Sequence, residues 1–227
     1  MYANSIHLID YFDMFCRGKI IKITTLKSGR ENPYVITSKL KFKILCEPFL
    51  SKRNIYPSIT TVLSILSEDG IRAWRARVGE EEANRISRQA SSRGTTVHNI
   101  IEKYVANNPE YIKGEMPHNI QTFKDVQKVI DEGVTKVYQQ EAPLYSKHLG
   151  VAGRVDCVGQ WNGKDSIIDW KTSRKFKKKE WISGYFMQCA AYAIMWEERT
   201  GMPIKQLVVC IAGDMGHQVF IEDRDNW

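Results

Sequence analysis

The pair Asn162-Gly163 lies between two runs of residues that are typical of β-strands, 151–161 and 164–171. A two-residue type I′ turn needs a positive φ at both central positions, and Asn-Gly is a pair that adopts it readily. The sequence therefore predicts a β-hairpin with these two residues as its turn. Because a two-residue turn fixes which residues face each other, the hairpin also sets the register of both strands.

That register places two aspartates opposite each other. Asp156 lies across from Asp169, with Cβ atoms roughly 5 Å apart, and Arg154 lies across from Lys171. Two bare carboxylates at that separation repel each other by about 3 kcal/mol at an effective dielectric constant of roughly 20. A divalent cation between them would convert the repulsion into binding energy. Lys171 shares the face of Asp169, because side chains alternate along a strand.

The alternative is that these charges are ordinary solvated residues on a hairpin. Apolar neighbours on both strands argue for burial instead: Val155, Val158, Ile167, Ile168 and Trp170. Buried carboxylates need partners that offset their loss of hydration.

Composition limits the class of protein. The chain has 227 residues, of which 43% are apolar, so it can bury a core as one domain with an N-terminal elaboration. The net charge of +7 permits nucleic-acid binding but does not establish it. The 5 cysteines are scattered without a CxxC motif, so their spacing predicts neither a zinc site nor an iron–sulfur cluster. Reduced thiols are therefore expected.

No targeting or membrane segment is evident in the sequence. No apolar run approaches ~18 residues, so no membrane span is expected. The first residues include Asp10 and Asp13 and lack a hydrophobic signal core. We therefore expect a cytoplasmic protein that is not secreted.

Local patterns predict an N-terminal β-rich extension over residues 1–56, with strands at 19–26 and 40–44, and a main domain over 57–227. One helix is expected to begin at Pro57 and a short one to lie around Trp74. A helix over 80–90 is followed by a break at Arg93-Gly94-Thr95 and by a helix over 95–105. Two more helices are expected over 119–140 and 180–199. The expected strands are 144–147, the two strands of the hairpin, 206–212 and 217–222. The apolar stripes are Ile59, Val62, Leu63 and Leu66 in the first helix, and Phe123, Val126, Ile130 and Val137 in the helix over 119–140. The order α-β-β-β-α-β predicts an α/β fold with a mixed sheet and helices on both faces.

Two helices carry polar residues one turn apart. His98 and Glu102 share a face of one helix, and Gln188 and Tyr192, joined by Tyr185, share a face of another. A helical histidine is more commonly a packed or surface residue, and the second group can be the solvated face of its helix.

The residues after Asp169 form a strongly basic run. The segment from Lys171 to Lys179 holds six cations in nine residues. Such a run can be a solvated loop or a nuclear-localisation-like signal. It can also be a patch that follows a phosphate backbone beside the proposed metal site.

Taken in order, these motifs resemble a known family: His98, Gly153-Arg154-Val155-Asp156, Asp169-Trp170-Lys171 and Gln188-x-x-x-Tyr192. The order resembles the RecB-type branch of the PD-(D/E)XK nuclease superfamily. Within that branch it is most similar to the mitochondrial genome maintenance exonucleases and their phage-encoded relatives. Residues 57–63, 93–98 and 168–173 carry the closer likeness, and the resemblance covers about residues 57–212.

The resemblance implies a restriction-endonuclease-like core, αβββαβ, with a helical cover. It implies an exonuclease in which Asp156, Asp169 and His98 bind Mg²⁺ or Mn²⁺ and Lys171 handles the nucleophilic water. The Trp170 carbonyl is expected as a third oxygen ligand. Oxygen ligands favour Mg²⁺, and an imidazole shifts the preference toward Mn²⁺. Contacts to DNA or support of the active site are expected from Gln188, Tyr192, Tyr185, Arg93, Arg174, Lys175, Lys177 and Lys178.

The chain departs from the family pattern in two ways. It lacks the C-terminal cysteine group of the members that carry an iron–sulfur cluster, so no cluster is expected. Val155 also replaces the proline that names the superfamily.

The first hypothesis for function is a metal-dependent DNA exonuclease on single strands or ends, in replication, repair or recombination. Proteins of those processes are the expected partners, and the oligomeric state is left open. If the chain is phage-encoded, the expected location is the cytoplasm of the host. The alternatives are a structure-specific endonuclease on the same site and a non-catalytic nucleic-acid-binding protein. The intact set of Asp156, Asp169 and Lys171 argues against the last.

Overall fold

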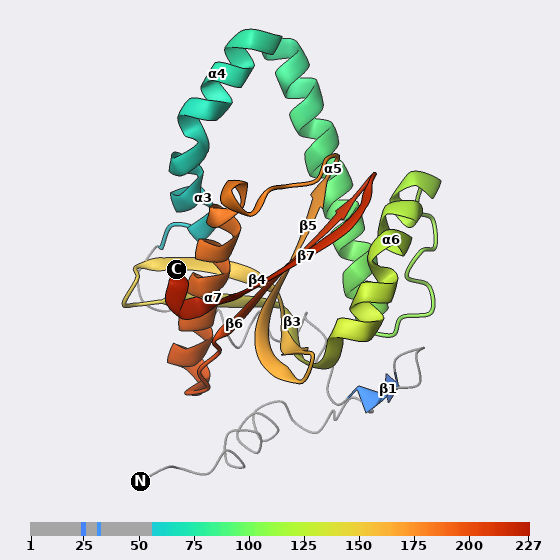
Figure 1. The fold of residues 1–227 in the computed structure, drawn as a ribbon, viewed down its shortest axis with the longest axis vertical. Coiled ribbons are helices and arrows are strands. Elements are labelled where there is room, and N and C mark those ends of the chain that lie inside the picture. Colours follow the sequence, from blue (N-terminus) through green and yellow to red (C-terminus); the bar gives the residue numbers. More distant parts are fainter. Residues whose placement is uncertain (1–23, 26–30, 33–55) are drawn as a thin grey trace.

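The computed structural model describes residues 24–25, 31–32 and 56–227. A five-stranded sheet in the order β3-β4-β5-β6-β7 lies between two groups of helices (Figure 1). The helices are α3 (Ile59–Ser64), α4 (Glu68–Val78), α5 (Glu80–Val105), α6 (Pro117–Gly133) and α7 (Ser183–Thr200). The strands of the sheet are β3 (Val134–Ser146), β4 (Val151–Trp161), β5 (Lys164–Ser173), β6 (Gln206–Gly213) and β7 (Gly216–Asp223). Short 3-10 turns are η1 (Ile65–Ser67), η2 (Lys179–Trp181) and η3 (Arg224–Asn226).

The hairpin is present as predicted. Asn162 has a φ of 52° and Gly163 a φ of 77°, as a type I′ turn requires. The antiparallel pairing of β4 with β5 runs from Trp161 opposite Lys164 to Cys157 opposite Ile168, which confirms the register for these pairs. Asp156 and Asp169 are the next residues beyond the last recorded pair.

The chain order confirms the predicted mixed fold. From α6 to β6 the elements follow the pattern α-β-β-β-α-β, and β7 adds a final antiparallel strand. The strands β5 and β6 are parallel, and α7 connects them. Parallel neighbours need such a crossover, whereas antiparallel neighbours can be joined by a tight turn.

Two apolar cores cover the two faces of the sheet. One lies between the sheet and α7, with Phe186 and Met195 fully buried, and α3 adds Ile59 at its edge. The other lies between the sheet and the helices α5 and α6, where Phe123 and Ile130 are fully buried. Burial of each such side chain stabilises the fold by ~1.5–3 kcal/mol.

The predicted helix break at Gly94 is wrong. The helix α5 continues without interruption from Glu80 to Val105. A glycine within a helix costs about 1 kcal/mol relative to alanine, but it does not end the helix when packing holds both sides. At Gly94 a Cβ atom would lie 3.5 Å from Oγ1 of Thr172, so the helix passes close to the end of β5.

The predicted helix over 119–140 is too long. The helix α6 ends at Gly133, and β3 begins at Val134. A Cβ atom on Gly133 would lie 2.4 Å from Cζ2 of Trp161, so only glycine lets the chain turn against that ring. Val137, which was expected in the helical stripe, is a buried residue of β3 instead.

The helices α4 and α5 form an arch that rises away from the sheet (Figure 1). They meet at Gly79, whose φ is 87°. The expected apolar stripe of the first helix is buried only in part, because Ile59 is buried whereas Leu66 is 67% exposed. No residue of α4 is buried, and the arch is joined at its top by the fully buried Ala83 of α5 and by the ion pair of Arg75 with Glu80.

Little of the predicted N-terminal extension can be compared with the structure. Two short strands, β1 (Thr24–Thr25) and β2 (Glu31–Asn32), pair in antiparallel fashion, and β1 falls within the expected strand at 19–26. The expected strand at 40–44 lies outside the described residues. Among the described helices, none has the length and apolar character needed to cross a membrane.

Candidate active site

Asp169 and Lys171 form a buried ion pair on β5. Asp169 is fully buried, and its Oδ2 contacts Nζ of Lys171, which lies two residues along the same strand. Burial raises the pKa of Asp169 to about 6, although the adjacent Lys171 opposes the shift. Apart from Lys171, no described residue donates a hydrogen bond to this Oδ2. It therefore retains capacity for a further ligand.

Asp156 joins this pair from the neighbouring strand β4. Its Oδ2 accepts a hydrogen bond from the backbone N–H of Trp170 at 2.9 Å. Burial raises the pKa of Asp156, and Lys171 opposes the rise. The Asp156 charge in turn raises the pKa of Asp169, so the two carboxyl groups interact directly. The structure thus brings together the two aspartates that the hairpin register predicted.

His98 approaches the same carboxylate from the helix α5. Its Nδ1 lies 3.6 Å from Oδ2 of Asp156. Burial lowers the pKa of His98, the charge of Lys171 lowers it further, and Asp169 partly offsets both effects. A neutral imidazole is the form that can act as a metal ligand.

Lys171 is surrounded by negative charge and an aromatic ring. Burial alone would lower its pKa, but Asp169 and Asp156 outweigh that effect and raise the pKa above its usual value. Nζ also lies 5.2 Å from the centre of the Tyr185 ring, a cation–π distance. With these neighbours the side chain is an ammonium group, suited to orient a water molecule or to neutralise developing charge.

The helix α7 supplies a polar support for Asp169. Nε2 of Gln188 donates to Oδ1 of Asp169 and to Oη of Tyr192, each at 3.3 Å. Tyr192 packs directly on β4, where a Cβ atom on Gly153 would lie 2.7 Å from Cε1 of the ring. The glycine of the Gly153-Arg154-Val155-Asp156 motif therefore makes room for this tyrosine.

Sequence reasoning missed Glu141, which lies on β3, the strand that pairs with the strand of Asp156. Its Oε2 lies 2.7 Å from Nε of Arg154, and its φ is 49°, unusual for a residue other than glycine. Burial raises the pKa of Glu141 to about 7, and the charge of Asp156 adds to the shift. Because residue 141 follows a segment predicted as helix, no strand pattern pointed to it.

The basic residues predicted to bind DNA differ in how far they are engaged. Arg93 forms an ion pair with Asp214 and donates to Oγ1 of Thr122 at 3.1 Å, so it links α5 to α6 and to the β6–β7 turn. Arg174 reaches Oε1 of Gln89 at 3.4 Å. Lys175 and Lys178 are exposed, and Lys177 is half-buried.

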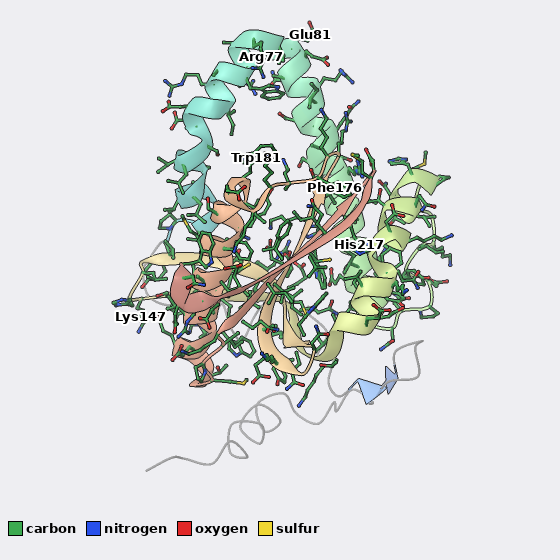
Figure 2. All side chains as sticks on the ribbon, viewed as in Figure 1. Arg77, Glu81, Lys147, Phe176, Trp181 and His217 are labelled. Carbon is green, nitrogen blue, oxygen red and sulfur yellow. The ribbon has the colours of Figure 1, made fainter. Side chains whose placement is uncertain are left out.

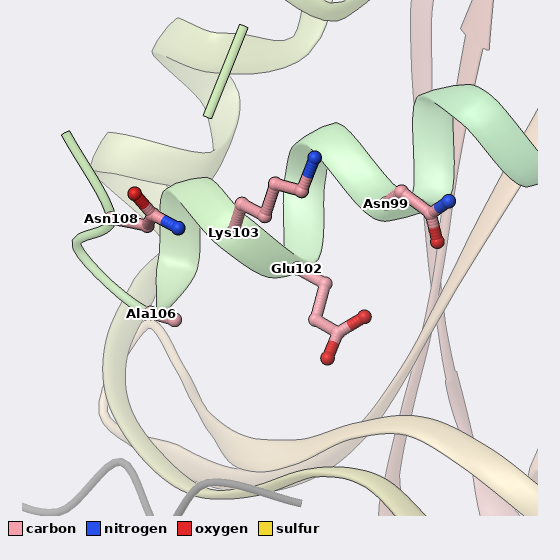
Figure 3. Close-up of a pocket in the computed structure, with 5 residues that line it drawn as sticks. All are labelled: Asn99, Glu102, Lys103, Ala106 and Asn108. Atoms are coloured by element: carbon pink, nitrogen blue, oxygen red, sulfur yellow. The ribbon is translucent and has the colours of Figure 1, made fainter. Parts of the chain in front are cut away.

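A pocket opens beside the C-terminal half of α5 (Figure 3). Its lining includes Glu102, which lies one helical turn beyond His98. The charge of Glu102 also raises the pKa of Glu141. The lining residues are Asn99, Glu102, Lys103, Ala106 and Asn108.

The donor atoms fit a divalent cation only in part. Among the described residues, no three side chains of the types His, Cys, Asp and Glu are already grouped so as to hold a metal ion. Oδ2 of Asp169, which pairs with Lys171, and the neighbouring carboxylate of Asp156 provide two oxygen donors. The expected full set with His98 is therefore not preformed. An oxygen-binding cation such as Mg²⁺ fits the two carboxylates, with His98 adjacent to them.

Comparisons with known proteins agree with this geometry. A sequence model of the PD-(D/E)XK nuclease superfamily matches residues 68–219. Three relatives share the name mitochondrial genome maintenance exonuclease 1. The protein of Mus musculus is 24% identical over 159 residues, 66% of this chain and 45% of the relative. That of Homo sapiens is 27% identical over 155 residues, 62% of this chain and 44% of the relative. That of Xenopus tropicalis is 26% identical over 210 residues, 79% of this chain and 60% of the relative. The chain thus spans less than two thirds of the length of these relatives.

Proposed function

The chain belongs to the PD-(D/E)XK nuclease superfamily, and from that premise we propose that it is a metal-dependent DNA exonuclease acting on single strands or DNA ends. The observation that carries the proposal is the buried Asp169–Lys171 pair, with Asp156 beside it on the neighbouring strand. Fully buried charges are costly, and such sites are where proteins arrange catalytic groups.

The residues that would hold the metal are Asp156 and Asp169, with His98 and the Trp170 carbonyl as additional donors. When bound, Mg²⁺ or Mn²⁺ supplies Lewis acidity toward the phosphoryl oxygens and lowers the pKa of a coordinated water. The backbone N–H of Trp170 fixes the orientation of the Asp156 carboxylate. Gln188 does the same for Asp169 through Oδ1.

Lys171 acts beside these carboxylates as a positioned cation. Its ammonium group orients the attacking water and offsets negative charge that develops on the phosphate. Because Lys171 lies on a central strand and contacts Asp169, its position is fixed before the substrate arrives. Charge stabilisation of this preorganised kind contributes about 10²–10³-fold to a rate.

The basic segment after β5, beside the arch of α4 and α5, supplies contacts to the phosphates of the strand. In Figure 1 the arch and this segment lie at the same edge of the sheet, where β5 ends. Lys175 and Lys178 are exposed there and can follow phosphates without reading the sequence. The name exonuclease, which the similar proteins of Mus musculus and Homo sapiens carry, supports action on strand ends.

The test is digestion of end-labelled linear and closed circular single-stranded DNA, with Mg²⁺, with Mn²⁺ and with EDTA. An exonuclease degrades only the linear form, and only with metal. Cleavage of the circle would show the endonuclease alternative, and binding without cleavage of either form would show the non-catalytic one.

Substitution of the central residues tests the assignment of the site. Lys171→Ala and Asp169→Asn should each lower the cleavage rate by at least ~100-fold, while binding to DNA largely survives. Lys171→Met preserves the packing of the side chain, and thermal unfolding checks that each variant is folded. Lys164→Ala, an exposed lysine of the same strand, is the matched control. A Lys171→Ala enzyme that cleaves at the wild-type rate would overturn the assignment.

A further inference from the structure

The segment between β5 and α7, residues 174–182, is held in place against β7. The backbone N–H of Lys177 donates to Oε1 of Gln218 at 2.7 Å, and Nε2 of Gln218 donates to the carbonyl of Lys177 at 3.0 Å. Lys179 forms an ion pair with Glu222 of the same strand. A segment with these anchors keeps its side chains in a defined place, although much of its surface is exposed.

Two large aromatic side chains of this segment are exposed. Trp181 is 66% exposed and Phe176 is 48% exposed. Figure 2 shows Trp181 below the arch of α4 and α5, and Phe176 beside the α5 arm. Burial of such a ring is favourable, so its exposure on an anchored segment indicates a site where another molecule covers it.

The charge around Trp181 identifies the kind of molecule. Nζ of Lys178 lies 5.4 Å from the centre of the Trp181 ring. Lys175 and Lys178 are exposed on the same segment, so the aromatic surface lies among cations. An apolar protein partner would leave these lysines unpaired, whereas a nucleic-acid strand offers a base for each ring and a phosphate for each lysine.

We propose that Trp181 is a stacking platform for one unpaired nucleobase of the strand, and that Phe176 receives a second base nearer to β5. The inference rests on the proposed function and names the feature of DNA that this part of the site recognises. In a duplex the bases are stacked on each other and cannot reach a protein ring. The pair of rings therefore selects single-stranded DNA, and it accepts every base because each has a flat aromatic face.

Stacking on Trp181 predicts a loss of affinity at one position of the strand, and stacking on Phe176 predicts a second such position. The probe is a set of fluorescently labelled single-stranded oligonucleotides, each with one abasic residue at a different distance from the end. Binding is measured in EDTA, so that the metal-dependent cleavage proposed above does not occur. For the wild-type protein, an abasic residue at the position of the base on Trp181 should weaken binding by ~5- to ~150-fold, the range that base–aromatic stacking supplies.

Trp181 variants decide whether that position belongs to this ring. Trp181→Ala should bind intact DNA as weakly as the wild type binds the critical abasic strand, and the abasic residue should then have little further effect. Trp181→Phe keeps a ring and should restore most of the difference. Met215→Ala, which removes an exposed apolar side chain from the β6–β7 turn, is the matched control and should bind as the wild type does.

Two outcomes would overturn the inference. One is that Trp181→Ala binds intact DNA as tightly as the wild type does. The ring would then contact a protein partner or only solvent, and not a base. The other is that the abasic residue weakens Trp181→Ala and wild type by the same factor, which would give Trp181 a structural role only. Failure of the proposed function is a separate result, because it requires that the wild type cleaves no DNA with either metal.

Discussion

Substitution of Gly153 by alanine tests how closely α7 must approach β4 to support the active site. A Cβ atom at this position would lie 2.7 Å from Cε1 and 3.0 Å from Oη of Tyr192, and 3.1 Å from Cγ2 of Ile59. Real contacts of a Cβ atom with a ring carbon are longer than this, so the ring must move. Tyr192 is only 2% exposed, which leaves it little space to do so.

Insertion of one methyl group into a packed interior costs ~1–3 kcal/mol of the free energy of unfolding. For a chain of this size each kcal/mol lowers the midpoint of thermal unfolding by roughly 2–4 °C, so Gly153→Ala should lower it by about 2–12 °C. The displaced Tyr192 also loses its hydrogen bond from Gln188, the residue that donates to Asp169. Cleavage should therefore decrease even at temperatures where the variant is folded.

The assay is thermal unfolding of a double-mutant cycle, with Gly153→Ala, Tyr192→Ala and both changes together. A double-mutant cycle isolates the interaction between the two substituted positions. If the Tyr192 ring causes the loss of stability, Gly153→Ala should lower the free energy of unfolding by less than ~1 kcal/mol when Tyr192 is already alanine. Gly184→Ala is the control, because a Cβ atom there meets no atom within 4 Å and improves helix propensity by up to ~1 kcal/mol. If Gly153→Ala lowers the free energy of unfolding equally with and without the Tyr192 ring, contact with that ring is not the cause.

Two further predictions concern metal and DNA. His98→Ala should impair cleavage, with partial rescue by excess Mn²⁺ because a missing ligand raises the dissociation constant of the metal, whereas a histidine with only a packing role predicts lower thermal stability and unchanged dependence on Mn²⁺. Titration of activity against Mn²⁺ for both proteins decides between these outcomes. Replacement of Lys177, Lys178 and Lys179 by alanine should weaken binding to single-stranded DNA and reduce its salt dependence by up to about three phosphate contacts. Since Lys179 is paired with Glu222, a reduction nearer to about two contacts is expected, and an unchanged salt slope would show that the lysines are only solvated.

Local chemistry allowed much of the site to be predicted from the sequence. The turn at Asn162-Gly163 depends on the φ preferences of two adjacent residues, so the hairpin and its register followed without knowledge of the rest of the fold. The register then placed Asp156 near Asp169, and strand alternation placed Lys171 on the face of Asp169. Each of these steps needs only short-range geometry.

Only the tertiary structure decided the features that depend on residues far apart in the chain. The chain passes from α6 into β3 at Gly133, where the ring of Trp161 leaves no room for a Cβ atom, whereas α5 continues through Gly94, where the nearest atom lies 3.5 Å from the position of a Cβ. Both are glycines in helical patterns, and nothing local distinguishes them.

The same limit applies to the residues around the carboxylates. Glu141 comes close to Asp156 because β3 pairs with β4, and Arg93 is engaged by Asp214 from a turn more than a hundred residues later. Trp181 and Phe176 are large aromatic residues of the kind that proteins mostly bury, yet both are exposed. Burial depends on which surfaces meet when the helices pack on the sheet. The sequence therefore determined the hairpin that carries Asp156 and Asp169, and the packing decided which side chains surround it.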